Sequence, residues 1–357
     1  MRYRYRPGGN AVVNAGVAVV VLATPFLVAA AEPAARATEA QRPLPGCTAA
    51  IAYADLHRGV SVLVLQDGVP VCQSKDVSRP HELWSGTKSF VGVIAAAAVQ
   101  DGLIRLDDPV ADTIEQWRGD RTRNQITIAQ LLSMTSGHAT TIGRAPGYRD
   151  ALQSPLSAKP GERFQYGPDT LQIFGEVLRR KLVKSGLDEN PRDYIERRLF
   201  TPLGITAAAW RNGPDGLPLM PQGAIMSAVQ WAKFGEFVRL GGKINGRHLV
   251  DPKAFAALFR GSAANPAYGL TWWLAATPRA PDPVSAASDI GQHLDTIPRD
   301  LVFAAGFGDQ RMYVIPSKRL TIVRQAQLDL AALRPGSQQP GGKRWSDAQF
   351  LGLLLNS

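Results

Sequence analysis

One short stretch, Ser85-Gly86-Thr87-Lys88, carries a hydroxyl and an amine at a spacing that suits nucleophilic catalysis, and it is the only Ser-x-x-Lys in the sequence. On a helix, side chains three residues apart share a face, so Lys88 would reach Ser85. A lysine in an apolar setting loses its proton readily and can act as a general base for a serine. An N-cap serine beside a surface lysine is the alternative interpretation, and only the surrounding sequence separates the two.

The residues that follow predict a buried helix that would hold this pair. Residues 91–100 are apolar on nearly every face, and Gly102 is placed to end the helix. Ser85 would lie in the first turn, where backbone N–H groups have no intrahelical partner and the helix dipole favours negative charge. The N–H of Ser85 could therefore donate to an oxyanion.

Strand patterns lie near both ends of the chain, and helix patterns lie between them. An Asp67-Gly68 turn predicts a hairpin of residues 61–66 and 69–72. Further strands are expected at 268–274, 301–305, 312–315 and 320–325. Helices are expected after caps at Thr127, Asp169, Ser227, Asp251 and Ser346, and over 191–199. This order predicts an α+β fold, with one antiparallel sheet built from both termini, flanking helices and an all-helical insertion.

The N-terminus has the pattern of an export signal. Three arginines precede an apolar run at 15–31, so residues 1–31 read as a signal peptide and 32–45 as a flexible leader. An uncleaved membrane anchor is the alternative. Export, which points to a bacterial periplasm, would permit a disulfide between Cys47 and Cys72, although two separate thiols fit the sequence equally well.

Charge and histidine spacing argue against two other classes of function. The formal charge is +10, but the basic residues are scattered and not interleaved with aromatic residues, which does not support nucleic-acid binding. No metal-ligand spacing occurs among the histidines, so we expect each of them to be a surface or loop residue: His57, His81, His138, His248 and His293. No metal or organic cofactor is expected.

Several short sequence motifs occur together in the order typical of one enzyme family. They lie at residues 84–90, 101–110, 126–137, 159–166, 201–205 and 268–273. Together they resemble the penicillin-recognising serine hydrolases, and most closely the class C β-lactamase-related group, which includes esterases, D-alanyl peptidases and 6-aminohexanoate-dimer amidases. The resemblance covers roughly residues 55–330 and implies the β-lactamase/transpeptidase-like fold. Residues 46–84 and 265–357 would form the α/β part, and 85–264 the mostly helical part.

The resemblance implies roles for individual residues. Ser85 corresponds to the nucleophile that forms the acyl-enzyme, and Lys88 to the group that accepts its proton. Tyr166 corresponds to the tyrosine of the second motif, Tyr-x-Asn in most members, whose phenol would relay protons to the leaving group. The third motif aligns best with Gly306-Phe307-Gly308, which would bind substrate, and the N–H of Asp309 would join that of Ser85 in the oxyanion hole.

Two departures from the family pattern bear on the substrate. Pro168 stands where the family's asparagine donates to the substrate amide, and proline has no donor to offer. Gly306-Phe307 replaces the cation and hydroxyl that bind a substrate carboxylate. A small neutral ester or amide is therefore favoured over a β-lactam or D-alanyl peptide, unless a cation such as Arg144 or Arg149 takes over that role. A non-catalytic envelope protein that keeps the fold as a recognition module is the alternative from a different class.

Overall fold

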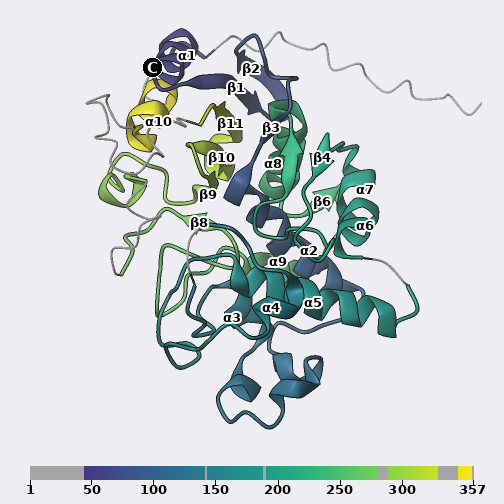
Figure 1. Cartoon of the computed structure of the whole chain (residues 1–357). Helices are drawn as coiled ribbons and strands as arrows, with labels where there is room; N and C mark the ends of the chain where they lie inside the picture. The colour runs from purple at the N-terminus through teal and green to yellow at the C-terminus, as the bar shows by residue number, and fades with distance from the viewer. Residues whose placement is uncertain (1–43, 141–142, 188–189, 280–287, 329–344, 356–357) are drawn as a thin grey trace, which may run out of the picture. The chain divides into compact units, whose positions relative to one another are not determined.

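A six-stranded antiparallel sheet forms the core of the computed structural model, which describes residues 44–140, 143–187, 190–279, 288–328 and 345–355. All of them belong to one compact unit, residues 41–357 (Figure 1). The strand order is β2-β1-β11-β10-β9-β8. The strands are β1 (Gly59–Gln66), β2 (Val69–Gln73), β8 (Trp273–Leu274), β9 (Val302–Gly306), β10 (Gln310–Ile315) and β11 (Leu320–Ala326). The predicted fold, with strands from both ends of the chain in one sheet, is confirmed. The predicted signal peptide and most of the leader lie outside the described residues.

The register of the sheet follows from turn chemistry and strand pairing. The predicted hairpin is present: Asp67 and Gly68 both have positive φ, 50° and 79°, as a two-residue turn between right-twisted strands requires. β1 pairs with β11 from Gly59↔Ala326 to Gln66↔Leu320, so the first and last long strands of the sheet are neighbours. The central strands β10 and β11 are buried along their whole length.

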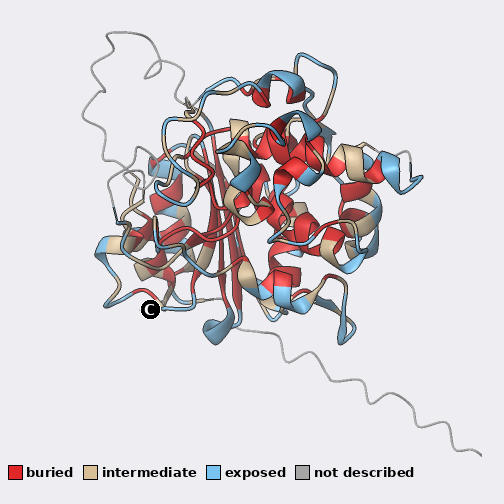
Figure 2. Cartoon of the chain, turned by 90° about the horizontal axis from the view of Figure 1, so that it is seen from below, coloured by how far each residue is buried: buried red, intermediate tan, exposed pale blue. Residues whose placement is uncertain are grey.

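Helices cover both faces of this sheet, whose strands are among the most buried segments (Figure 2). On one face, α1 (Cys47–Leu56) packs on β1 and on α10 (Asp347–Leu355); on the other, α8 (Ala228–Arg239) packs on β1, β10 and β11 (Figure 1). Although α8 comes from the segment expected to be the helical part, it serves as a cover of the sheet. The other helices are α2 (Lys88–Gln100), α3 (Ile128–Leu132), α4 (Tyr148–Ala151), α5 (Asp169–Lys184), α6 (Pro191–Ile195), α7 (Thr201–Leu203) and α9 (Pro252–Ala257).

The predicted central helix is α2, and its burial is nearly complete. Every residue from Lys88 to Ala98 is buried. A Cβ at Gly92 would come within 2.5 Å of the Leu270 carbonyl oxygen, so the helix packs directly on neighbouring backbone. The helix ends as expected at Gly102, with φ 70°. A 3₁₀ turn, η1 (Trp84–Thr87), precedes it.

Three local predictions differ from the structure in detail. Asp169 does not cap α5, because Pro168 is the N-cap residue and the Asp169 carboxylate accepts hydrogen bonds from Thr140 and Ser154. The expected strand over 268–274 is reduced to Trp273–Leu274, because Thr271 adopts a left-handed conformation (φ 69°). The helix expected over 191–199 is present, but it is α-helical only from Pro191 to Ile195 and continues as a π-helical turn, Glu196–Phe200.

A disulfide joins Cys47 at the start of α1 to Cys72 in β2, which resolves the alternative left open by the sequence. It ties α1 to the outermost strand of the sheet, far in strand order from β9. None of the helices in the described ranges combines the length and the apolar character needed to cross a membrane.

Removing the disulfide should destabilise the protein without affecting chemistry at the opposite side of the sheet. The bond closes a loop with a sequence separation of 25, for which loop-closure entropy gives about 3 kcal/mol. We expect the double variant Cys47→Ser/Cys72→Ser to lose about that much free energy of unfolding in a urea titration. Equal urea midpoints for the parent protein with and without reductant would contradict this role.

Candidate active site

Ser85 and Lys88 face each other at the junction between η1 and α2. Side chains three residues apart nearly eclipse in a 3₁₀ turn, and the Lys88 Nζ donates a hydrogen bond of 2.8 Å to the Ser85 Oγ. The predicted contact between the two side chains is therefore present. The N–H groups at the start of such a turn have no partner within the turn. The Ser85 N–H is therefore of the kind that can donate a hydrogen bond to an oxyanion, as expected from the sequence.

Burial sets the protonation of Lys88. Its side chain is only 3% exposed, and besides Ser85 its Nζ donates to the carbonyl oxygen of Pro221 at 3.1 Å. Desolvation disfavours the charged ammonium and lowers the pKa of Lys88 to about 7. A substantial fraction of the amine is therefore neutral near pH 7 and able to accept a proton. The Pro221 contact had no signal in the sequence, because Pro221 is 133 residues away.

One strained backbone angle and two close packings hold the serine turn in place. Trp84, directly before the nucleophile, has φ 49°, a conformation that bulky residues rarely adopt and that is often found at functional sites. A Cβ at Gly86 would lie 2.8 Å from the Trp231 ring. A Cβ at Gly306, at the end of β9, would lie 2.0 Å from the Leu83 carbonyl oxygen. Glycines at these two positions let the turn rest directly against α8 and the sheet.

Tyr166 lies beside the lysine, inside a wall of aromatic rings. The Lys88 Nζ is 4.9 Å from the centre of the Tyr166 ring, so the second predicted motif is brought to the first. Trp273 contacts the Tyr166 ring at 5.5 Å and Tyr268 contacts it edge-on at 6.0 Å. Of the adjacent residues Trp272 and Trp273, only Trp273 faces this site. Trp272 points the other way and packs on Phe234 and Phe259.

Pro168, which stands at the asparagine position of the Tyr-x-Asn motif, has a structural role. Pro168 is the N-cap residue of α5, and Gly167 before it lies so close to Thr140 that a Cβ would be 1.7 Å from the hydroxyl oxygen. No side-chain amide can come from position 168. A backbone carbonyl, that of Pro221, is the second hydrogen-bond acceptor of the Lys88 ammonium.

The third motif forms the turn between β9 and β10. Gly306 pairs with Gln310, so the turn consists of Phe307, Gly308 and Asp309. Phe307 is 51% exposed and its ring meets the Trp84 ring edge-on at 6.1 Å. The end of β9 therefore lies next to the serine turn, with an apolar aromatic pair at its rim.

The carbonyl and the carboxylate of Asp309 contact two buried arginines. Its carbonyl oxygen accepts a 2.7 Å hydrogen bond from Arg324, and its carboxylate lies 3.7 Å from Arg311. These contacts fix the carbonyl and the side chain of Asp309, whereas the role expected of its N–H in the oxyanion hole stays a prediction. The spacing of the motif could not show these contacts, because the closing pair of the hairpin depends on the sheet register.

Other residues singled out in the sequence lie elsewhere or are buried. Two of the histidines are not surface residues: His57 and His138 are both buried. Burial and Arg123 lower the pKa of His138 to about 4. Arg144 and Arg149 line cavities of about 460 and 910 Å³ between the 139–155 segment, α5 and the 214–217 loop, and neither cavity is lined by Ser85, Lys88 or Tyr166.

Comparisons with known proteins agree with this geometry. Residues 49–332 match the sequence profile of the family described as Beta-lactamase. Protein flp of Staphylococcus aureus (strain COL) is 24% identical over 179 residues, which are 43% of this chain and 35% of that protein. The chain thus matches only about a third of the length of this curated relative.

Solved structures share the fold at low sequence identity. A putative β-lactamase from Bacteroides dorei DSM 17855 has a TM-score of 0.68 at 16% identity, covering 87% of this chain and 97% of the other. A putative 6-aminohexanoate-dimer hydrolase from Bacillus anthracis has a TM-score of 0.61 at 17% identity, covering 77% and 75%. EstCE1, a hydrolase with promiscuous acyltransferase activity, has a TM-score of 0.60 at 16% identity, covering 79% and 92%. The profile match, together with the Ser85–Lys88 pair on this fold, shows that the chain belongs to the β-lactamase family of serine hydrolases, with a class C-like architecture.

Proposed function

We propose that this protein hydrolyses a small neutral ester or amide through an acyl-enzyme on Ser85. The observation that carries the proposal is the 2.8 Å contact between the Lys88 Nζ and the Ser85 Oγ, with burial holding the pKa of Lys88 at about 7. A general base is most effective when its pKa lies near the working pH. A serine beside such an amine can be deprotonated as it attacks a carbonyl carbon.

The reaction takes two steps. Ser85 attacks the substrate carbonyl while its proton passes to the neutral Lys88, and the tetrahedral intermediate collapses as a proton is delivered to the leaving alcohol or amine. We assign Tyr166 a share in that transfer, which its ring centre at 4.9 Å from the Lys88 Nζ supports. Water then attacks the acyl-serine, and the same groups return the proton to Ser85.

For the oxyanion we assign the N–H of Phe307, in place of Asp309, as the partner of the Ser85 N–H. The Ala275 N–H donates to the Leu301 carbonyl at 3.1 Å, so Leu301 and, by alternation, Phe303 direct their main-chain groups toward β8. The same alternation directs Ala305 to that edge, and we assign the N–H of Phe307, the first residue of the turn after β9, to the same side. β8 pairs with β9 only as far as Phe303, which leaves room there for a substrate.

The rim of the site favours a substrate without a carboxylate. Phe307 and Trp84 present aromatic surface next to the serine. The guanidinium of Arg211 lies 5.7 Å from the centre of the Trp84 ring, and it is ion-paired with Glu82. A carboxylate bound here would have to compete with Glu82 for that cation, whereas a neutral acyl group would bury against the rings.

The Cys47–Cys72 disulfide supports the proposal that the enzyme works after export, in an oxidising compartment such as the periplasm, because such bonds persist there and are rare in the cytosol.

The role of Ser85 can be tested by substitution and by covalent labelling. We expect Ser85→Ala to retain its fold and to lose p-nitrophenyl butyrate hydrolysis by about a thousandfold or more, the scale for removing a nucleophile. A fluorophosphonate probe should label the parent protein and the control Ser185→Ala, which alters an exposed serine, but not Ser85→Ala. A parent protein that resists the probe would instead support a non-catalytic binding module.

The pKa of Lys88 predicts the pH dependence of the rate. Only the neutral amine accepts a proton, so kcat/KM should be low in acid and rise with a midpoint near pH 7. In Lys88→Arg the side chain keeps its charge but cannot release a proton. This variant should lower kcat/KM by about a hundredfold to ten-thousandfold and lose the rise of kcat/KM near pH 7. A flat profile for the parent enzyme from about pH 5 to about pH 9 would be incompatible with this base.

Substrate class is tested by comparing an ester with a β-lactam. Leaving a carboxylate partly desolvated and unpaired costs a few kcal/mol, so kcat/KM for nitrocefin should be roughly a hundredfold or more below that for p-nitrophenyl acetate, at tenfold per about 1.4 kcal/mol. Glu82→Gln releases Arg211 from its ion pair, so it should reduce the difference in kcat/KM between nitrocefin and p-nitrophenyl acetate. Nitrocefin turnover as fast as that of the ester would refute the preference for neutral substrates.

A further inference from the structure

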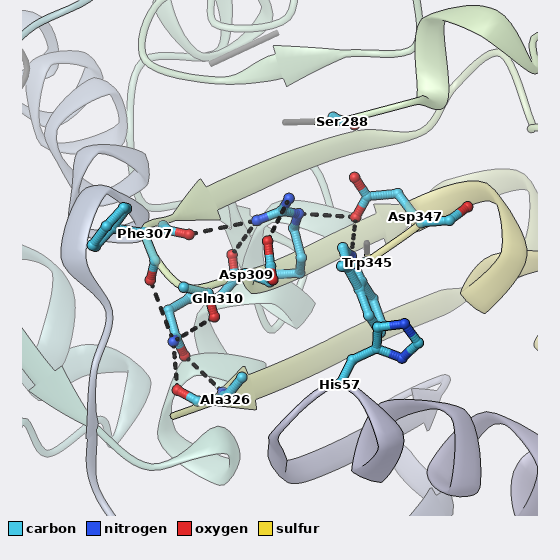
Figure 3. A network of polar contacts seen from close by, with 12 residues as sticks. His57, Ser288, Phe307, Asp309, Gln310, Ala326, Trp345 and Asp347 are labelled. Atoms are coloured by element: carbon cyan, nitrogen blue, oxygen red, sulfur yellow. Dashed lines mark hydrogen bonds and ion pairs between the residues drawn. The ribbon is translucent and has the colours of Figure 1, made fainter. Parts of the chain in front are cut away.

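Side chains of β10 and β11 bind all three carbonyl groups of the β9–β10 turn, Phe307–Asp309. The Gln310 Nε2 donates to the carbonyl oxygens of Phe307 at 3.4 Å and Gly308 at 3.2 Å, and the Arg324 Nη1 donates to that of Asp309 at 2.7 Å. Figure 3 shows the Gln310 carboxamide directed at the turn. A surface turn that is held at each of its residues cannot easily rotate its peptide planes.

Gln310 also fastens the turn to the neighbouring strand. Its carboxamide forms a two-way contact with Ala326 at the end of β11: the Nε2 donates to the carbonyl oxygen at 2.7 Å, and the Oε1 accepts from the N–H at 3.1 Å (Figure 3). The side chain is only 1% exposed, so these contacts are shielded from water. Gln310 therefore spans from the turn to β11 inside the protein.

A buried ion pair anchors the other side of the turn to the last helix. The Arg311 Nε donates to the Asp347 Oδ1 at 2.9 Å, and Arg311 also lies 3.7 Å from the Asp309 carboxylate. Burial tends to raise the pKa of Asp347, but attraction to Arg311 and hydrogen bonds from Tyr313 and other neighbours outweigh it and lower the pKa. Asp347 thus stays ionised and holds the Arg311 guanidinium near the Asp309 carboxylate.

Rigidity at this turn matters because an oxyanion donor stabilises developing charge only if it is already oriented. Gly306 at the base of the turn is in close packing with the Leu83 carbonyl, two residues before Ser85, so this turn abuts the serine turn. We propose that Gln310 is a positioning residue for the Phe307 N–H. Its side chain holds the peptide planes that follow Phe307, and its main chain pairs with Gly306, whose carbonyl shares a peptide plane with that N–H, so the turn keeps the N–H toward the oxyanion. This inference rests on the proposed acyl-enzyme function.

The experiment compares Gln310→Met with a matched control, Gln325→Met. Methionine keeps the length of the side chain and removes its hydrogen bonds. Gln325 is an equally buried glutamine on β11, but its carboxamide contacts Ser61 and Met226 and not the turn. The active fraction of each variant is counted with a fluorophosphonate probe, and kcat and KM for p-nitrophenyl butyrate are expressed per labelled site. Inhibition by an alkyl boronic acid reports binding of a tetrahedral, oxyanion-like adduct.

For Gln310→Met we expect kcat per labelled site to fall about tenfold to a hundredfold, less than the full loss of an oxyanion donor. Boronate affinity should fall in parallel, while KM changes less than about twofold. Gln325→Met should lower the Tm but keep kcat per labelled site. An unchanged kcat in Gln310→Met, or an equal loss in both variants, would overturn the inference. A parent enzyme that neither labels nor hydrolyses the ester would overturn the proposed function itself, and this inference with it.

A second variant tests the same contact if Gln310→Met fails to fold. In Gln310→Glu the ionised carboxylate cannot donate to the turn carbonyls, whereas the protonated acid can. The ratio of its kcat to that of the parent should therefore rise as the pH is lowered, because burial favours the neutral acid. A merely structural role predicts a ratio that does not depend on pH, and that result would overturn the inference.

Discussion

The desolvated amine of Lys88 is the constraint on which the rest of this site depends. An ammonium group kept away from water is costly, and the protein meets that cost by shifting the pKa of Lys88 to about 7 and offering two acceptors, Ser85 and Pro221. The neutral form of the amine is the form that a serine nucleophile needs. The burial that destabilises the Lys88 ammonium therefore also favours the neutral amine that acts as the base.

That burial requires the unusual composition of α2. A helix that is apolar on every side must be enclosed, and α2 is enclosed along its length from Lys88 to Ala98. Glycines at the contact points, such as Gly92 against the Leu270 carbonyl and Gly86 against Trp231, allow backbone to pack on backbone or ring. The enclosed helix thus fixes the position of Lys88, and the 3₁₀ turn before it places Ser85 directly beside the Lys88 amine.

The sheet contributes the second half of the site through buried polar side chains. Glutamine and arginine side chains inside a sheet are uncommon, because each polar atom must find a partner. Here the partners of Gln310 and Arg324 include the carbonyls of an exposed turn. The buried network therefore links the helical cover of the sheet, through Asp347 in α10, to the edge where a substrate would lie.

The sequence alone determined the features that depend on local chemistry and on motif spacing. The Ser85–Lys88 contact, the Asp67-Gly68 hairpin, the end of α2 at Gly102 and the antiparallel sheet from both termini were predictable, because turn residues, helix periodicity and i, i+3 spacing act over short distances. Tertiary structure decided what depends on register and on distant partners. It turned Asp309 toward Arg324, gave Lys88 the Pro221 carbonyl as an acceptor, placed α8 on the sheet and buried His138. Such contacts join residues far apart in the chain, so no local pattern encodes them.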